Sequence, residues 1–192
     1  GDSSTDFYFY CAKKYPRILR RVPKIIFCFL MYLFDFYDKT RMKQGFFEFF
    51  NDITDIDNEV EAFWRLKGNK IKKWYKEQKK EDDLIISASP EFLLEPILKR
   101  LGVKGLMASK VDKKTGIYDG LNCYGQEKVI RFNEKNLGKK IDNFYSDSLS
   151  DEPLSKLAGN SFLVNKNDII PWNEYRQTKF KKIITIFFAR DF

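Results

Sequence analysis

The hydrophobic pattern of the chain changes its period near residue 82, and this change limits the fold more than any other feature of the sequence. Between residues 6 and 80, aromatic and aliphatic side chains recur three and four positions apart, which is the spacing of one face of an α-helix. After residue 82, short apolar runs alternate with helical segments. Strands and helices that alternate in this way form βαβ units with a parallel sheet. We therefore expect an α/β protein, with a helical domain at 6–80 followed by an α/β region.

The second part of the chain predicts a regular series of strands and helices. Pro90 and Gly102 mark the start and the end of one of these helices. The predicted strands are 82–89, 103–111, 141–148 and 160–165, and the predicted helices are 90–102, 125–138 and 151–159. The turn sequence DKKTG before residues 117–122 predicts a β-hairpin. Because ligands of parallel sheets bind beyond the carboxyl ends of the strands, polar residues at those ends are the candidates for a site.

The residue types that are present exclude several kinds of chemistry. The sequence contains no histidine, so a Ser-His-Asp triad, a Cys-His pair and histidine metal sites are excluded. Cys11, Cys28 and Cys123 match no zinc pattern, and we expect a reduced, cytoplasmic protein. The formal net charge of +8 favours an anionic partner. Phosphate esters, nucleic acid and an acidic membrane surface all meet this condition.

Residues 22–34, with the sequence VPKIIFCFLMYLF, form the most apolar segment of the first part of the chain. Its uninterrupted apolar run, Ile25–Phe34, has ten residues, whereas a spanning helix needs about 20. Basic residues precede the segment as in a signal peptide, but no small-residue cleavage site follows it. We expect a helix buried inside the helical domain. A helix that touches a membrane surface, with membrane association of the protein, is the alternative that the sequence leaves open.

Three groups of polar residues fall at the ends of predicted strands or at the start of a predicted helix. Ser87 and Ser89 end one strand, Asp147 ends another with Asp151 four positions later, and Lys128 lies at the start of a helix. Taken singly, these are ordinary turn serines, a helix cap and a surface lysine. Taken together, two carboxylates could hold a hard cation such as Mg²⁺, and a hydroxyl and an ammonium could hold phosphoryl oxygens.

The order and spacing of these segments resemble the haloacid dehalogenase superfamily, in the subfamily with a helical cap that includes phosphoserine phosphatases. LIISASPEFL is similar to the second motif of that family, GLNCYGQEKV to the third, and NFYSDSLSDEPLSKLAG to the fourth. The resemblance is close over 82–165. The helical domain resembles the family's cap only in its place along the chain. The resemblance implies a Rossmann-like parallel-sheet core formed by 1–5 and 81–192, with an α-helical cap domain at 6–80 inserted near the N-terminus.

The resemblance also implies an activity and roles for particular residues. The activity is that of a magnesium-dependent phosphatase, which acts through an aspartyl-phosphate intermediate. Asp147 would be a direct Mg²⁺ ligand, and Asp151 would be a ligand or would orient a metal-bound water. Ser87, Ala88 and Lys128 would bind the phosphate, and Ser87, Lys128 and Asp151 would serve in catalysis. The expected substrate is a small phosphate monoester, and the many aromatic residues of the cap suggest one with an apolar portion.

One part of the family pattern is not found in the sequence. The first motif, Asp-x-Asp-Gly-Thr, carries the nucleophile on the first core strand, and Asp2 and Asp6 do not match its spacing. We therefore expect that strand upstream of residue 1, between the strands of the second and fourth motifs. The apolar segment 183–188 is an alternative occupant of that place.

Two other classes of function compete with the phosphatase. The first is a catalytically inactive member of the family that binds a phosphorylated ligand or partner. The second is a basic protein that binds nucleic acid or a membrane surface. No nucleic-acid motif supports a nucleic-acid partner, and we expect none. The oligomeric state is left open by the sequence.

Overall fold

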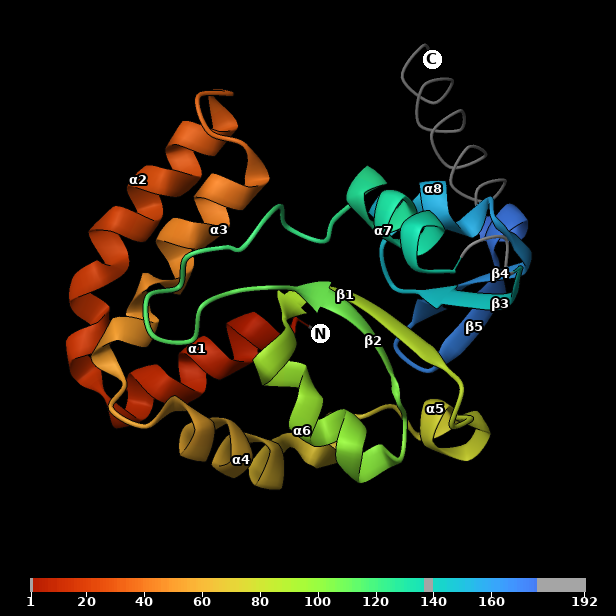
Figure 1. Ribbon diagram of the computed structural model, residues 1–192, viewed down its shortest axis with the longest axis horizontal. Coiled ribbons are helices and arrows are strands. Elements are labelled where there is room, and N and C mark those ends of the chain that lie inside the picture. The colour runs from red at the N-terminus through yellow and green to blue at the C-terminus, as the bar shows by residue number, and fades with distance from the viewer. Residues whose placement is uncertain (1, 137–139, 176–192) are drawn as a thin grey trace, which may run out of the picture. The chain divides into compact units, whose positions relative to one another are not determined.

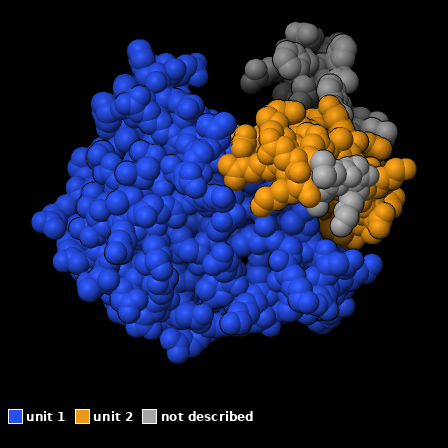
Figure 2. Space-filling view, in the orientation of Figure 1, with its two compact units in different colours: residues 1–123 blue, residues 124–192 orange. Residues whose placement is uncertain are grey.

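The computed structural model describes residues 2–136 and 140–175 (Figure 1). The chain forms two compact units, residues 1–123 and 124–192 (Figure 2). Unit 1 contains all of the predicted helical domain together with the first strand–helix–strand segment of the predicted core. The boundary between the units falls inside the third motif, so unit 2 contains the part of that motif with Lys128 and the whole fourth motif. The division into a cap at 6–80 and a core remains a prediction.

The first 80 residues fold as helices, as the spacing of their apolar residues predicts. Asp2, Asp38 and Asp55 begin three of these helices, and each side chain accepts a hydrogen bond from a backbone N–H of the first turn. The helices are α1 Ser3–Lys14, η1 Pro16–Arg21, α2 Val22–Leu33, α3 Lys39–Phe47, η2 Glu48–Asp52, α4 Ile56–Lys67, η3 Gly68–Lys70 and α5 Lys73–Gln78.

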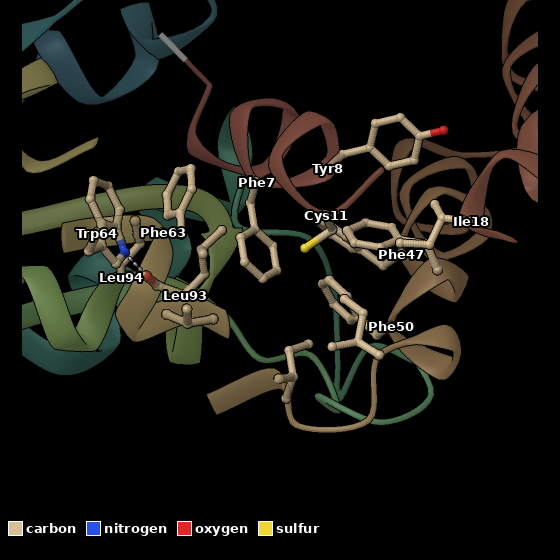
Figure 3. Close-up of a cluster of buried hydrophobic side chains, with 14 of the residues drawn as sticks. Phe7, Tyr8, Cys11, Ile18, Phe47, Phe50, Phe63, Trp64, Leu93 and Leu94 are labelled. Carbon is tan, nitrogen blue, oxygen red and sulfur yellow. Dashed lines mark hydrogen bonds between the residues drawn. The ribbon is translucent and has the colours of Figure 1, made fainter. Parts of the chain in front are cut away.

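The core of unit 1 is built largely from phenylalanine side chains (Figure 3). Phe7 of α1 packs edge-to-face against Phe63 of α4, with ring centroids 5.4 Å apart. Trp64 donates its indole N–H to the backbone oxygen of Leu93, which joins α4 to the helix that follows the first strand. The helical segment and the first strand–helix–strand segment therefore share one hydrophobic core.

That strand–helix–strand segment consists of β1 Leu84–Pro90, α6 Glu91–Leu101 and β2 Gly105–Ser109. The two strands are parallel, and Leu84 pairs with Gly105 at the start of the ladder. Gly102 ends α6 in the left-handed conformation that glycine adopts readily, with φ 71°. The predicted hairpin is reduced to one antiparallel bridge, between Val111 and Tyr118.

Unit 2 contains α7 Gln126–Asn136, β3 Ile141–Ser146, η4 Leu149–Asp151, α8 Glu152–Ser155, β4 Ala158–Asn165 and β5 Asp168–Pro171. Strand β4 lies between β3, to which it is parallel, and β5, to which it is antiparallel. The predicted helix over 151–159 is too long. Ala158 and Gly159 belong to β4, because Ala158 pairs with Ile141 at the start of the ladder, and this pairing outweighs the local helical preference.

Strands β1 and β3 each lie at the edge of their sheets. Among the described residues, no strand pairs with β1 on the side opposite β2, or with β3 on the side opposite β4. The sequence predicts that the strand of the first motif lies between the strands of the second and fourth motifs, which are β1 and β3. This stays a prediction. The alternative occupant, 183–188, lies outside the described residues.

The predicted helix over 22–34 forms as α2, but the expectation that it is buried is wrong. Of its residues, all of which the structure describes, only Cys28 is buried. Cys28 packs on Gly45 of α3 so closely that a Cβ at Gly45 would collide with the Cys28 Sγ. Val22, Ile25, Met31 and Tyr32 are half-buried, and the other residues of the helix are exposed. Within residues 2–136 and 140–175, no helix is long and apolar enough to cross a membrane.

Helices α1 and α4 are joined by a buried carboxylate. Glu59 of α4 is 3% exposed and accepts hydrogen bonds from Lys14 Nζ (2.6 Å), Tyr15 Oη (2.7 Å) and Tyr10 Oη (3.0 Å). Burial alone would raise the pKa of Glu59, but these three donors outweigh it and hold the pKa below its ordinary value. A carboxyl whose pKa is lowered by folding stabilises the folded state only while it is ionised.

We expect Glu59→Gln to lower the free energy of unfolding by about 1–3 kcal/mol at neutral pH, because buried donors lose a charged acceptor. The loss should be present above the unfolded-state pKa of about 4.3 and should shrink as the pH falls through the lowered folded-state pKa. Urea unfolding at a series of pH values measures both effects. Glu61→Gln is the matched control, since Glu61 is on the same helix, pairs with Arg100 and is half-exposed. Equal losses of unfolding free energy for the two variants would contradict the stabilising role assigned to the buried Glu59 carboxylate.

Candidate active site

Ser87, the predicted phosphate-binding serine, lies within β1 where the strand ladder becomes irregular. The pairing with β2 is regular to Ile86 and shifts before Pro90. The Ser87 Oγ accepts a hydrogen bond from the Ser89 N–H at 3.1 Å. Its hydroxyl proton can still be donated to an oxygen of a ligand, because a hydroxyl both donates and accepts. Ser87 and Ala88 are half-buried.

Two residues that the sequence did not single out contact the same end of β1. Lys43 of α3 donates from Nζ to the Ala88 oxygen at 3.0 Å, and the Ser4 hydroxyl of α1 donates to the Ser89 Oγ at 3.0 Å. Lys43 gave no signal in the sequence, because it lies in the mostly polar stretch 39–45 and its partner is 45 residues away. Ser4 gave no signal of its own, because its partner is 85 residues away in the sequence.

A cavity of about 390 Å³ opens beside these residues within unit 1. Ser4 and Lys43 form part of its wall, and the remaining wall is mainly apolar. Its full lining is Asp2, Ser4, Thr5, Ile25, Ile26, Phe29, Met42, Lys43 and Phe46. The Ser4 hydroxyl and the Lys43 ammonium, near the end of β1, are therefore next to a cavity whose wall suits an apolar group of a ligand.

In unit 2, the structure brings Lys128 and Asp151 into direct contact. Lys128 Nζ lies 2.8 Å from Oδ2 and 2.7 Å from Oδ1 of Asp151. Ser146, at the end of β3, donates its hydroxyl to Asp151 Oδ2 at 2.7 Å. Lys128 and Asp151 are 8% and 6% exposed. Buried charges are costly unless they are paired and hydrogen-bonded, and this pair meets both conditions.

The local sequence explains why these residues meet. Strand β3 ends at Ser146, and the turn after it is closed by the Ser148 side chain, which caps η4 by accepting from the Ser150 N–H. The turn brings Asp151 back over the end of β3, where Ser146 reaches it. Lys128 comes from the first turn of α7. Ser146 was missed by sequence reasoning, although a serine at the end of an apolar strand is a detectable signal.

Asp147 directly follows β3 and is exposed. Among the described residues, no group of three or more acidic, histidine or cysteine side chains is placed to hold a metal ion. Mg²⁺ is often bound through only one or two carboxylates, with waters and substrate phosphate as its other ligands. Asp147 fits that mode as an exposed carboxylate. Because Lys128 and Ser146 already contact the Asp151 carboxylate, Asp151 fits the expected orienting role better than direct ligation.

The family model of haloacid dehalogenase-like hydrolases matches residues 1–156, which is most of the chain. The chain belongs to this family. The matched range contains the second and third motifs and the fourth motif as far as Lys156, including Asp147 and Asp151, so the predicted family membership is confirmed. The α/β fold with parallel strands is confirmed as well.

Two curated relatives and one solved structure are similar to this haloacid dehalogenase-like chain. A protein of Mycobacterium tuberculosis strain H37Rv named "probable phosphatase" is 33% identical over 91 residues, which are 44% of this chain and 32% of the relative. A histidinol-phosphatase of Neisseria meningitidis serogroup C is 27% identical over 99 residues, which are 44% of each chain. The chain thus spans less than half the length of these relatives.

The solved structure is that of a protein of unknown function from Bordetella pertussis Tohama I. It superimposes with a TM-score of 0.63 at 18% sequence identity, over 83% of this chain and 82% of that one. At 18% identity, this similarity is evidence for a shared fold and for nothing more.

Proposed function

We propose that this chain belongs to a magnesium-dependent phosphatase, which hydrolyses a small phosphate monoester in the cytoplasm through an aspartyl-phosphate intermediate. The observation that carries the proposal is the buried ion pair between Lys128 and Asp151 at the end of β3. A buried lysine held by one carboxylate and placed where a parallel strand ends is suited to meet a phosphoryl group. Two relatives whose names include the word phosphatase support the same reading.

Each candidate residue has a role that its surroundings support. The Ser87 hydroxyl, beside the Ala88 backbone, would donate to a phosphoryl oxygen. The Lys128 ammonium would neutralise negative charge on the phosphate and on the attacking carboxylate. Asp151 and Ser146 would keep the Lys128 Nζ in place, since both oxygens of Asp151 lie within 2.8 Å of it. In this scheme the nucleophile is an aspartate of the family's first motif.

Asp147 would hold the metal ion, and Asp151 would orient a water bound to it. When bound, Mg²⁺ supplies positive charge that stabilises the phosphoryl group during transfer. The exposed position of Asp147 leaves its carboxylate accessible to an ion that keeps several waters.

The hydrolysis of a generic aryl phosphate by the native protein, with Mg²⁺ and with excess chelator, tests the proposal. Phosphate release should require Mg²⁺, and Ser87→Ala should lower kcat/KM about 10–100-fold, the effect of one hydrogen bond to a charged group. Ser89→Ala is the matched control, because the Ser89 hydroxyl is buried and bonded to Ser4, so its loss should affect stability alone. If the protein binds phosphate esters without hydrolysing them, the inactive family member is the correct reading.

A further inference from the structure

Helix α2 and the turn after it present a continuous set of apolar side chains to solvent. Ile26, Leu30 and Leu33 follow each other at helical spacing along one side of the helix. The set, called here the α2 face, is between 43% and 73% exposed and consists of Ile26, Phe27, Phe29, Leu30, Leu33, Phe34 and Phe36. Ile26 and Phe29, at one edge of the face, also line the cavity of unit 1. Soluble proteins seldom expose large contiguous apolar patches, so a patch of this kind marks an interaction site.

The α2 face is a fixed surface and not the side of a loosely attached helix. The contact of Cys28 with Gly45 holds α2 against α3. Beyond the end of α2, the backbone N–H groups of Phe36 and Tyr37 both donate to the Met31 oxygen, at 2.9 and 3.1 Å. These bonds close the turn that carries Phe34 and Phe36. This turn lies between α2 and α3, at one end of the helix pair (Figure 1). Phe34 and Phe36 are the two most exposed aromatic residues of the face.

Basic residues precede the α2 face in the sequence, at the opposite end of the helix from Phe34 and Phe36. Lys14, Arg21 and Lys24 are paired with the acidic residues Glu59, Glu48 and Asp52. Residues 13–41 contain eight basic and two acidic side chains. Near the start of α2, the Arg17 guanidinium donates to the Asp52 backbone oxygen, and the Arg20 guanidinium donates to the Arg17 backbone oxygen. Among the described residues, neither arginine forms an ion pair with a carboxylate. Leu19, which is exposed between them, extends the apolar surface toward these charges.

We propose that the α2 face binds the surface of an anionic lipid bilayer, with its apolar side chains in the boundary between headgroups and acyl chains. Helix α2 has 12 residues and is about 18 Å long, too short to cross a membrane but suited to lie along its surface. Arg17 and Arg20 would contact anionic headgroups, while Phe34 and Phe36 would enter the apolar layer. The proposal does not depend on the proposed phosphatase chemistry.

The positive charge and the apolar side chains of this surface together favour an anionic bilayer over a second copy of the chain and over a nucleic acid. A dimer formed through the α2 face would bring the arginines of both copies into one interface, and η1 and α2 contain no acidic residue that could pair with them. A nucleic acid offers phosphates for the arginines, but its backbone does not accommodate a row of exposed leucine and phenylalanine side chains. An anionic bilayer offers both negative headgroups and an apolar interior.

Co-sedimentation of the full chain with vesicles tests the proposal, using phosphatidylcholine alone and an equal mixture of phosphatidylcholine and phosphatidylglycerol. We expect binding to the mixed vesicles that weakens as salt is raised. The double variant Phe34→Glu/Phe36→Glu should lower the partition coefficient at least about tenfold. The double variant Leu66→Glu/Ile117→Glu is the matched control, since both side chains are exposed apolar residues outside the α2 face. Far-UV circular dichroism checks that each variant is folded.

A second pair of variants tests the charges. Arg17→Gln/Arg20→Gln should weaken binding to the mixed vesicles and reduce its salt dependence, whereas Lys99→Gln/Lys110→Gln, at two exposed lysines elsewhere in unit 1, should not. Equal binding to both kinds of vesicle, or full binding by the folded Phe34→Glu/Phe36→Glu variant, would overturn the proposal. So would a dimer in light scattering that this variant dissociates, together with no vesicle binding, because a second copy would then be the partner.

Discussion

Lys128→Ala should reduce kcat of the native protein about 10²–10³-fold, which is the usual effect of removing one charged or hydrogen-bonding group that stabilises transition-state charge. The reason lies in the position of the ammonium, which is buried and held against Asp151 within 2.8 Å. Steady-state hydrolysis of a phosphate monoester measures the effect. Lys135→Ala is the matched control, because Lys135 is an exposed residue of the same helix. Similar losses at both positions would mean that bulk positive charge, and not Lys128 itself, supports the reaction.

The loss of Lys128 also leaves the buried carboxylate of Asp151 without its cation, which costs stability. A second variant separates this effect from catalysis. In Lys128→Ala/Asp151→Ala neither charge remains, so the folded state should recover stability relative to Lys128→Ala alone while activity stays low. Urea unfolding of the three proteins, measured beside their activities, makes the distinction. Recovery of activity along with stability would show that Lys128 has only a structural role.

Asp147→Asn should lower magnesium-dependent turnover at least about 100-fold, corresponding to roughly 3 kcal/mol of lost transition-state stabilisation. The carboxylate is exposed at the end of β3, so its replacement removes no core packing and should leave the fold intact. Asp142→Asn is the matched control, since Asp142 is an exposed aspartate on the same strand. The Mg²⁺ concentration needed for half-maximal rate should rise for Asp147→Asn and stay unchanged for the control. A rate within about twofold of the parent would contradict the metal assignment.

The sequence was most informative where a local pattern decides the structure. The spacing of apolar residues gave the helices of the first 80 residues, and the alternation of strands and helices gave β1, α6 and β2. Ser87, Lys128 and Asp151 could be named because each lies near the end of a predicted strand or at the start of a predicted helix, although Ser87 lies within β1 in the structure. The contact between Lys128 and Asp151 then follows from the turn after β3, which brings Asp151 back over the strand end.

The parts that could not be predicted depend on contacts between distant positions. The bonds of Ser4 to Ser89 and of Lys43 to Ala88 join segments that are 85 and 45 residues apart, and such contacts leave no periodic signal. Ala158 and Gly159 continue a sequence that is locally helical, and only their pairing beside β3 makes them strand. The exposure of α2 was mispredicted because apolar residues at helical spacing indicate a surface to be covered, without indicating whether the protein itself covers it.

The central claim, that this chain belongs to a phosphatase which forms an aspartyl-phosphate, is tested most directly by trapping the intermediate. The native protein is mixed with a phosphate monoester and Mg²⁺, quenched in acid within one turnover, and analysed by mass spectrometry. The account predicts a mass increase of one phosphoryl group on an aspartate, which disappears without Mg²⁺ and is strongly reduced in Asp147→Asn. Release of phosphate with no phosphorylated aspartate at any quench time, or no reaction with any ester in a broad panel, would contradict it.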